Sequence, residues 1–180
     1  EKFKDLVAKK GFDKLTTKMI TDAAGVIRPT FYNYFQDKYE VMEWLLWEDV
    51  FKEVSELMEQ ERGMESLKLL FRKFEEDKTY YEKVFEVTGQ NSFEEMLYGQ
   101  IFNMEEILVK HHPLKHLSNM PHVDEKVFLE FHAISLVNGL KYWLIRESKN
   151  ISAGDAMEFY QYMMSHSILD LLDIENTEKK

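Results

Sequence analysis

The sequence contains no cysteine among its 180 residues. Disulfide bonds, thiolate metal sites and cysteine nucleophiles are therefore excluded, and their absence fits a reducing cytosol. Only three prolines and seven glycines are present, which favours long helices because these two residues are the commonest helix breakers. No apolar run approaches the roughly 18–20 residues of a membrane-spanning helix, and no signal segment opens the chain. We therefore expect a cytoplasmic protein without a membrane partner. Because the first residue is Glu1, we also expect the first helix to be truncated.

Charge is distributed unevenly along the chain. The formal net charge is −10. Residues 1–38 nevertheless hold eight basic and five acidic residues, a balance of +3, which leaves −13 for residues 39–180. A basic head on an acidic body predicts that the head meets a polyanion and the body does not. Chance clustering of charges on solvated helices is the alternative.

Hydrophobic residues recur at helical spacing throughout the chain. Gly11 and Gly25 are placed to end the first two helices, and Pro29 suits the first turn of the third. Further helices are expected over 38–62, 64–76, 78–87, 93–111, 124–148 and 152–174. No alternation of the β type occurs over a useful length, so the predicted fold class is all-α.

The second and third helices, joined by a glycine-centred turn, predict a helix-turn-helix, whose second helix enters the major groove of DNA. Phe31 and Phe35 lie four residues apart and are expected to anchor that helix to the core. Neighbouring polar side chains then face outward, where they reach phosphates or base edges. The starts of the adjacent helices add sites that favour an anion. The predicted DNA-contacting residues are Thr17, Lys18, Arg28, Pro29, Thr30, Tyr32, Asn33, Tyr34 and Lys38.

The segment GFDKLTTKMITDAAGVIRPTFYNYFQDKYEVMEWLL, residues 11–46, resembles the DNA-binding head of the TetR family of bacterial transcriptional regulators. The glycine-aromatic pair, the AGV turn and the pattern TxYxYFxxK carry the resemblance, which covers about the first quarter of the chain. It implies an all-helical homodimer with a helix-turn-helix head over 1–38 and a body over 39–180. The head would bind a pseudo-palindromic double-stranded operator. The body would bind a small-molecule effector or a protein partner and dimerise through its last two helices, with no cofactor.

Three positions depart from the family pattern, and one of them is Asp22, where alanine is more usual. Ile27 stands where serine or threonine is usual, so the third helix lacks a side-chain cap worth about 1 kcal/mol. Pro29 stands where glycine is common and partly compensates by fixing the first turn. The runs RPTFYNYFQ and LKYWLIRES resemble a subgroup that includes an activator of a dihydroxyacetone kinase operon. Repression is the first expectation, and activation or a relative that acts only through a protein partner are the alternatives.

Aromatic and methionine side chains of the body suit either a plain core or an aromatic-lined effector pocket. Gln100, His132 and Asn138 are the more informative candidates, because a buried polar group needs a partner. The predicted pocket residues are Phe71, Phe74, Tyr81, Phe85, Met96, Gln100, Met104, Phe131, His132, Asn138 and Tyr142.

The last two predicted helices carry more apolar residues than one stripe requires. One face can pack on the body, and a second copy of the chain can cover the other in a four-helix interface. Full burial within a monomer is the alternative. The predicted interface residues are Val127, Ile134, Leu140, Trp143, Leu144, Tyr160, Met163, Met164, Ile168 and Leu171.

Other chemistry is not expected. His111, His112, His116 and His122 crowd one loop, but their spacing matches no closed tetrahedral metal site. The sequence has no nucleophile elbow, phosphate-cradling glycine loop or metal motif, which argues against an enzyme. The runs FEEDK and NMEEI are expected to be solvated helix faces.

Overall fold

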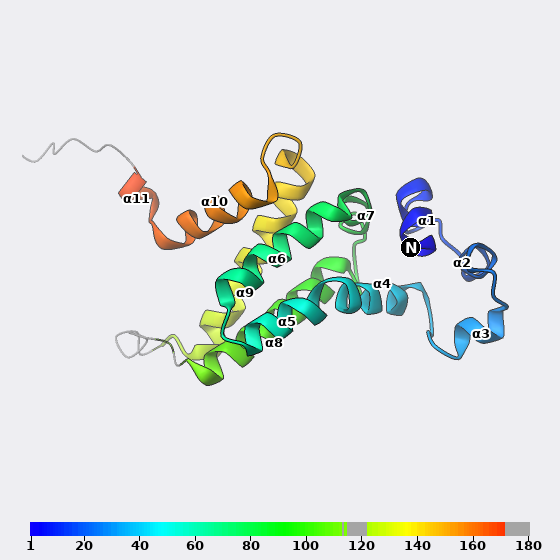
Figure 1. Cartoon of the computed structure of the whole chain (residues 1–180), viewed down its shortest axis with the longest axis horizontal. Coiled ribbons are helices and arrows are strands. Elements are labelled where there is room, and N and C mark those ends of the chain that lie inside the picture. Colours follow the sequence, from blue (N-terminus) through cyan, green and yellow to red (C-terminus); the bar gives the residue numbers. More distant parts are fainter. Residues whose placement is uncertain (113, 115–121, 172–180) are drawn as a thin grey trace, which may run out of the picture.

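The head consists of three short helices at one end of the molecule (Figure 1). The computed structural model describes residues 1–112, 114 and 122–171. Within these residues the chain is entirely helical and forms no strand, which confirms the predicted all-α class. The head helices are α1 (Lys2–Lys10), α2 (Thr17–Ala24) and α3 (Arg28–Tyr32).

A long helical segment leads from the head into the body. It comprises α4 (Lys38–Leu46), a π-helical turn η1 (Trp47–Phe51) and α5 (Lys52–Glu59). The Asp37 carboxylate caps it by accepting hydrogen bonds from the backbone of Tyr39 and Glu40 at 2.8 and 3.0 Å, as expected for an acidic residue at a helix start. The predicted helix over 38–62 is thus present, ending three residues earlier.

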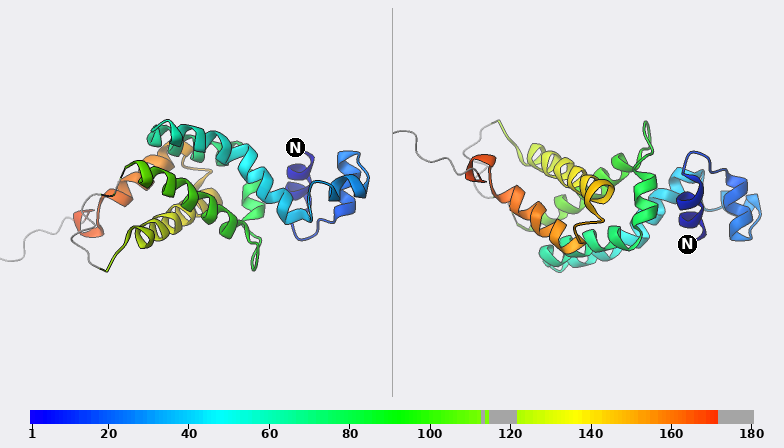
Figure 2. Two further views of the ribbon diagram at one scale, coloured as in Figure 1. Left: turned by 90° about the horizontal axis from the view of Figure 1, so that it is seen from below. Right: turned by 90° about the horizontal axis from the view of Figure 1, so that it is seen from above.

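The body is a bundle built on further helices (Figure 2). These are α6 (Gly63–Glu76), α7 (Lys78–Val84), α8 (Phe93–His111), α9 (Glu125–Tyr142), which continues into the π-helical turn η3 (Trp143–Glu147), and α10 (Ala153–Ser165). Helix α8 packs against α9, while α10 packs against α6. Among the described residues, no helix is long and apolar enough to cross a membrane.

The last predicted helix, over 152–174, is wrong as a single element. His166 is extended, with φ −130° and ψ 140°, and a short α11 (Ile168–Leu171) follows. The Ser167 N–H donates to the Asp170 carboxylate at 2.7 Å, and the Asp170 N–H donates to the Ser167 hydroxyl at 3.3 Å. This reciprocal capping box starts a new helix. Residues 172–174 lie outside the described residues.

One hydrophobic core runs through head and body. In the head, Phe3 packs edge-on against Phe12, with ring centroids 6.4 Å apart, and equally against Tyr80 of α7. In the body, an aromatic cluster joins Phe74, Tyr81 and Phe93, with centroids 4.3–6.3 Å apart. The head is therefore packed directly on the body through α1 and α7.

Candidate nucleic-acid interface and regulatory body

The turn between α2 and α3 has the geometry that the sequence predicts. Gly25 is left-handed, with φ 69°, which favours glycine because it has no Cβ. The Val26 N–H donates to the Thr21 carbonyl at 3.0 Å and closes the turn. Thr21 itself is buried and donates its hydroxyl to the Lys18 carbonyl. The turn therefore sets the direction in which α3 leaves α2.

Phe31 anchors α3 in the head. Its side chain is only 6% exposed and lies 5.7 Å from the Phe35 ring, which in turn lies 5.7 Å from Trp44 of α4. Because a helix of this length has one inward face, the remaining side chains turn outward. The predicted contact residues of α3 and of the two positions after it are mostly exposed: Arg28, Pro29, Tyr32, Asn33 and Tyr34. Thr30 is half-buried.

Two apolar residues at the same edge were not predicted as contacts. Ile27 is 69% exposed and Val26 39% exposed, directly before α3. Isolated exposed apolar side chains need no explanation by themselves. Beside an outward polar helix, however, they suit contact with thymine methyl groups in a major groove. The sequence pattern indicates only a missing cap at Ile27, and its position beside Arg28 is the signal that identifies it as a candidate contact.

The Lys38 ammonium has a structural role inside the head. Its Nζ donates to the carbonyls of Phe12, Asp13 and Leu15 at 3.0, 3.1 and 3.3 Å. It also lies 4.6 Å from the centroid of the Phe12 ring. An ammonium has three donors, and all three are used. The expected phosphate contact through this side chain is therefore corrected to support of the loop before α2.

Substituting Lys38 should separate support of the fold from phosphate contact. Lys38→Met is expected to lower the free energy of unfolding by about 1–3 kcal/mol, because three carbonyls lose their donor. Lys18 is exposed, with only a 3.7 Å contact to Asp22, so Lys18→Ala is the matched control. It should leave stability nearly unchanged and lower the salt dependence of DNA binding by about one phosphate. Denaturation measures stability, and DNA titration measures the salt dependence. If Lys38→Met kept its stability and lowered the salt dependence, the predicted phosphate contact of Lys38 would be supported instead.

A buried ionic contact joins the head to the body. Lys4 of α1 is 8% exposed, and its Nζ lies 2.7 Å from Asp49 of η1 and 2.5 Å from Asp77, next to α7. Burial alone lowers the pKa of Lys4, but hydrogen bonds to the two carboxylates outweigh it, and the pKa ends above its ordinary value. Sequence reasoning counted Lys4 only as part of a basic head. The structure places it at the junction, where three elements meet.

The predicted effector pocket is mostly a packed core. Phe74, Tyr81 and Phe85 belong to the aromatic cluster with Phe93, and their side chains fill the space between them. Met104 is buried, and Met96 and Gln100 are half-buried. Three other predicted lining residues lie on the surface, because α9 turns them away from the body: Phe131, Asn138 and Tyr142. The Asn138 amide is satisfied by its own helix, donating to the Ile134 carbonyl at 2.9 Å.

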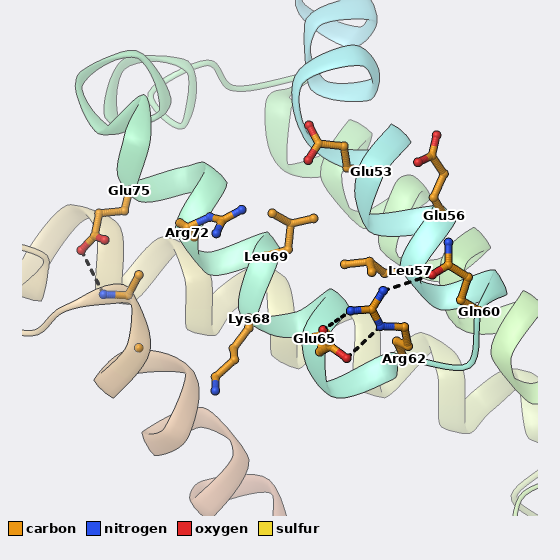
Figure 3. A pocket seen from close by; sticks show the side chains of 12 residues that line it. Glu53, Glu56, Leu57, Gln60, Arg62, Glu65, Lys68, Leu69, Arg72 and Glu75 are labelled. Atoms are coloured by element: carbon orange, nitrogen blue, oxygen red, sulfur yellow. Dashed lines mark hydrogen bonds and ion pairs between the residues drawn. The ribbon is translucent and has the colours of Figure 1, made fainter.

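A charged cleft of about 660 Å³ lies between α5, α6 and the start of α10. Figure 3 shows acidic and basic side chains of α5 and α6 around it. Arg62 donates to Glu65 at 2.8 Å, and Glu75 accepts from the Ala153 N–H at 3.0 Å. The side chains that line this cleft are of both charges and largely exposed, so the cleft favours no particular class of ligand. None of the predicted pocket residues lines it.

A second hollow, of about 360 Å³, lies between α9 and α10 and is mainly apolar. We call it the α9–α10 groove. Three predicted pocket residues line it: Phe71, Asn138 and Tyr142. Its other walls come from both helices and from η3, and they include Trp143, Phe159, Tyr160 and Met163. The groove opens on the same surface as the exposed apolar residues of α9 and α10.

A buried polar cluster lies next to Tyr160, one of the residues that line this groove. Glu105 of α8 is buried, and its carboxylate is bonded to Nδ1 of His132 on α9 at 2.6 Å. The ring of Tyr160 stands edge-on to His132, with centroids 6.3 Å apart. The prediction that NMEEI is a solvated face is therefore wrong at Glu105, which sits on the inner side of α8 beside Met104. His132 was correctly predicted to need a partner, and Glu105 supplies it.

The predicted dimer residues differ in how far the chain itself buries them. The side chains of Val127, Ile134, Met163, Met164 and Ile168 are exposed. Leu140, Trp143 and Leu144 are buried within the chain, so they are corrected from interface to core. Tyr160 is half-buried, and the side chain of Leu171 lies outside the described residues. Neighbouring exposed residues enlarge the apolar face: Phe128, Phe131, Tyr142, Ile145, Phe159 and Tyr162.

No metal site occurs among the described side chains, where no group of three or more His, Asp or Glu is suitably placed. His112 lies 3.7 Å from Glu61, and both are exposed. His116 lies outside the described residues.

Comparison with known proteins agrees with this arrangement. Residues 4–44 match the family model "Bacterial regulatory proteins, tetR family", and residues 61–165, more than half of the chain, match "Transcriptional regulator C-terminal region". The HTH-type dhaKLM operon transcriptional activator DhaS of Lactococcus lactis subsp. lactis is 30% identical over 83 residues, which are 46% of this chain and 44% of that protein. A solved structure, "Dihydroxyacetone kinase operon activator DhaS", has a TM-score of 0.58 at 23% identity and covers 91% of this chain and 88% of its own.

These matches account for the head and most of the body, in a family of regulators rather than enzymes. The similarity to the solved structure is a similarity of fold. The subgroup resemblance seen in the sequence is confirmed as a distant one. The chain belongs to the TetR family of DNA-binding transcriptional regulators.

Proposed function

We propose that two copies of this chain bind a pseudo-palindromic operator, each inserting α3 into a major groove, under the control of a signal bound in the body. The observation that carries the proposal is the outward polar edge of α3, held by the buried Phe31. Arg28 and Asn33 can make paired hydrogen bonds to base edges, while Thr30 and Tyr34 suit phosphates. Thr17 and Lys18, at the start of α2, would add phosphate contacts.

The apolar face of α9 and α10 supports the dimer. Phe131 of α9 is 68% exposed and Phe159 of α10 is 60% exposed. Further exposed apolar side chains accompany them on both helices. A contiguous apolar surface of this kind marks an interaction site. A two-fold arrangement would cover it with its own copy and present two heads to two half-sites.

The junction at Lys4 supports control of the heads by the body. A signal that moves α7 or the η1 turn would shift Asp77 or Asp49 relative to Lys4, and with them α1. Binding of a signal to the body can alter DNA affinity only if the signal-bound and signal-free states of the chain differ in such contacts. The sequence favoured repression, but the relative is named as an activator, which favours activation as the second candidate. A reporter behind the operator, with and without the chain, distinguishes them.

Selection of bound sequences from random duplexes, repeated at two salt concentrations, tests the proposal. We expect a palindrome whose half-sites lie about one helical turn apart or a multiple of it, and an affinity that falls steeply with salt. Arg28→Ala should relax the base preference at one position of each half-site, whereas Lys18→Ala should weaken all sequences alike. Enrichment of no sequence, with no salt dependence, would favour a relative that acts only through a protein partner.

A further inference from the structure

Glu105 is a buried carboxylate that is only half satisfied. It is 6% exposed, and one oxygen, Oε1, is bonded to Nδ1 of His132 at 2.6 Å. The other oxygen, Oε2, is fully buried and has no hydrogen-bond partner among the described residues. Leaving a buried charged acceptor without a donor is costly. Such a group in a native fold therefore calls for a donor that the chain itself does not provide.

Tyr160 places a second unpartnered polar atom in the same region. Its hydroxyl is buried and has no hydrogen-bond partner within the described part of the chain. Burial, and then the negative charge of Glu105, raise the pKa of Tyr160 well above its ordinary value. The phenol is therefore neutral and presents both a donor and an acceptor. Side chains from α8 and α10, together with His132 of α9, thus converge on one place.

The surroundings of these groups are aromatic, and Tyr160 also lines the α9–α10 groove. Tyr160 and Phe71, whose rings lie 6.3 Å apart, both line the α9–α10 groove. Phe128 stacks on His132, with an interplanar angle of 15° and centroids 6.1 Å apart. Tyr160 therefore belongs both to the mainly apolar groove wall and to the polar cluster, whose other members, His132 and Glu105, lie beyond the groove lining.

Charge around the groove is of one sign. Glu147 lines it, and no lysine or arginine does so among the described residues. An anionic ligand would meet the carboxylate of Glu147 at the groove and, beyond Tyr160, that of Glu105, whose one partner among the described residues is His132. A cation would be favoured at both positions, and aromatic faces stabilise cations further. A neutral ligand would satisfy Oε2 only if it carried a hydroxyl or amide donor.

We propose that the α9–α10 groove, with Tyr160 in its wall and Glu105 beyond Tyr160, binds an organic ammonium ion with an apolar or aromatic body. The ammonium would donate to Oε2 of Glu105 and to the Tyr160 hydroxyl oxygen, and the apolar body would lie against Trp143 and Phe159. This inference rests on the proposed function, since it gives the chemical class of the signal that the body receives. The groove opens on the face assigned to the second copy, so a dimer would close over the ligand.

Three phenyl-bearing probes of similar size and different charge test the site on the full chain by calorimetry. Phenethylammonium, 2-phenylethanol and 3-phenylpropionate share the ring and differ in the terminal group. We expect the ammonium to bind at least tenfold more tightly than the alcohol, and the carboxylate to show no measurable binding. Equal affinity of the three probes, or no binding of the ammonium at millimolar concentration, would overturn the proposal.

Variants localise the binding. Glu105→Gln should weaken the ammonium at least tenfold, and Tyr160→Phe severalfold, while both retain the helical circular dichroism of the parent. Glu106→Gln, at the adjacent half-buried position, is the matched control and should bind like the parent. An unchanged affinity in Glu105→Gln would contradict the assignment. Should that variant not fold, the order of the three probes on the parent still decides.

The probes are titrated without DNA, so a failure of the regulator proposal is visible separately. If the regulator proposal fails, no operator sequence is selected, while the ammonium still binds. Loss of ammonium binding with intact operator selection would overturn the effector class alone.

Discussion

Replacing Phe31 by alanine is expected to abolish operator binding and to lower the free energy of unfolding by about 3–5 kcal/mol. The side chain is 6% exposed and contacts the rings of Tyr32 and Phe35, at centroid distances of 5.4 and 5.7 Å. It is the only fully buried residue of α3, a helix that has no side-chain cap at Ile27. Without this anchor the polar edge of α3 loses its fixed direction. Chemical denaturation and DNA titration measure the two effects.

Two substitutions separate the anchor from the contact surface. Phe31→Leu retains an apolar side chain and should keep most of the operator affinity. Tyr32→Phe removes an exposed hydroxyl, so it should change stability by less than about 0.5 kcal/mol and affect only DNA binding. If Phe31→Ala, tested where it is still folded, bound the operator like the parent, the aiming of α3 by this side chain would be refuted.

Replacing Phe131 by glutamate is expected to convert the proposed dimer to a monomer and to weaken operator binding by about a hundredfold or more. The side chain is 68% exposed in the single chain, so folding of the protomer does not require it. In a two-fold interface the substitution would bury two carboxylates among apolar neighbours such as Ile134, without a partner. A separated head also loses the effective concentration that the second head provides. Sedimentation and DNA titration at matched concentrations measure both.

Phe131→Leu is the control, because it keeps the site apolar and should stay dimeric. Circular dichroism should be the same for both variants. A parent chain that sediments as a monomer at micromolar concentration, or a Phe131→Glu chain that remains dimeric, would show that this face has another role. The core positions Leu140, Trp143 and Leu144 are poor choices for such a test, since they are buried within the protomer.

Local sequence patterns were sufficient to predict the structure of the head. The positions of Gly25, Phe31 and Phe35 predict a turn, an anchored helix and an outward edge, because helical periodicity relates these residues over a few positions. The break at His166 was also a local signal, since Ser167 and Asp170 form a capping box. It was missed because the apolar spacing on both sides of the break suggests one continuous helix.

The partners and the burial of charged side chains could not be predicted from such local patterns. Lys38 and the carbonyl of Phe12 are 26 positions apart, and Lys4 and Asp77 are 73 apart. Glu105 and Glu106 are adjacent acids on one helix, yet the first is buried because α9 brings His132 against it. Sequence alone does not distinguish them, since the partner of a long polar side chain depends on which helices meet.

The sequence by itself determined the all-helical class, the helix-turn-helix head and its family, because these follow from short-range spacing and turn chemistry. The packing of distant helices was needed to show which lysines are free to meet a phosphate, which apolar residues of α9 and η3 face the core, and where a half-satisfied buried carboxylate lies. Each of these depends on the packing of helices far apart in the chain, which is set by the shape of the whole core rather than by any one segment.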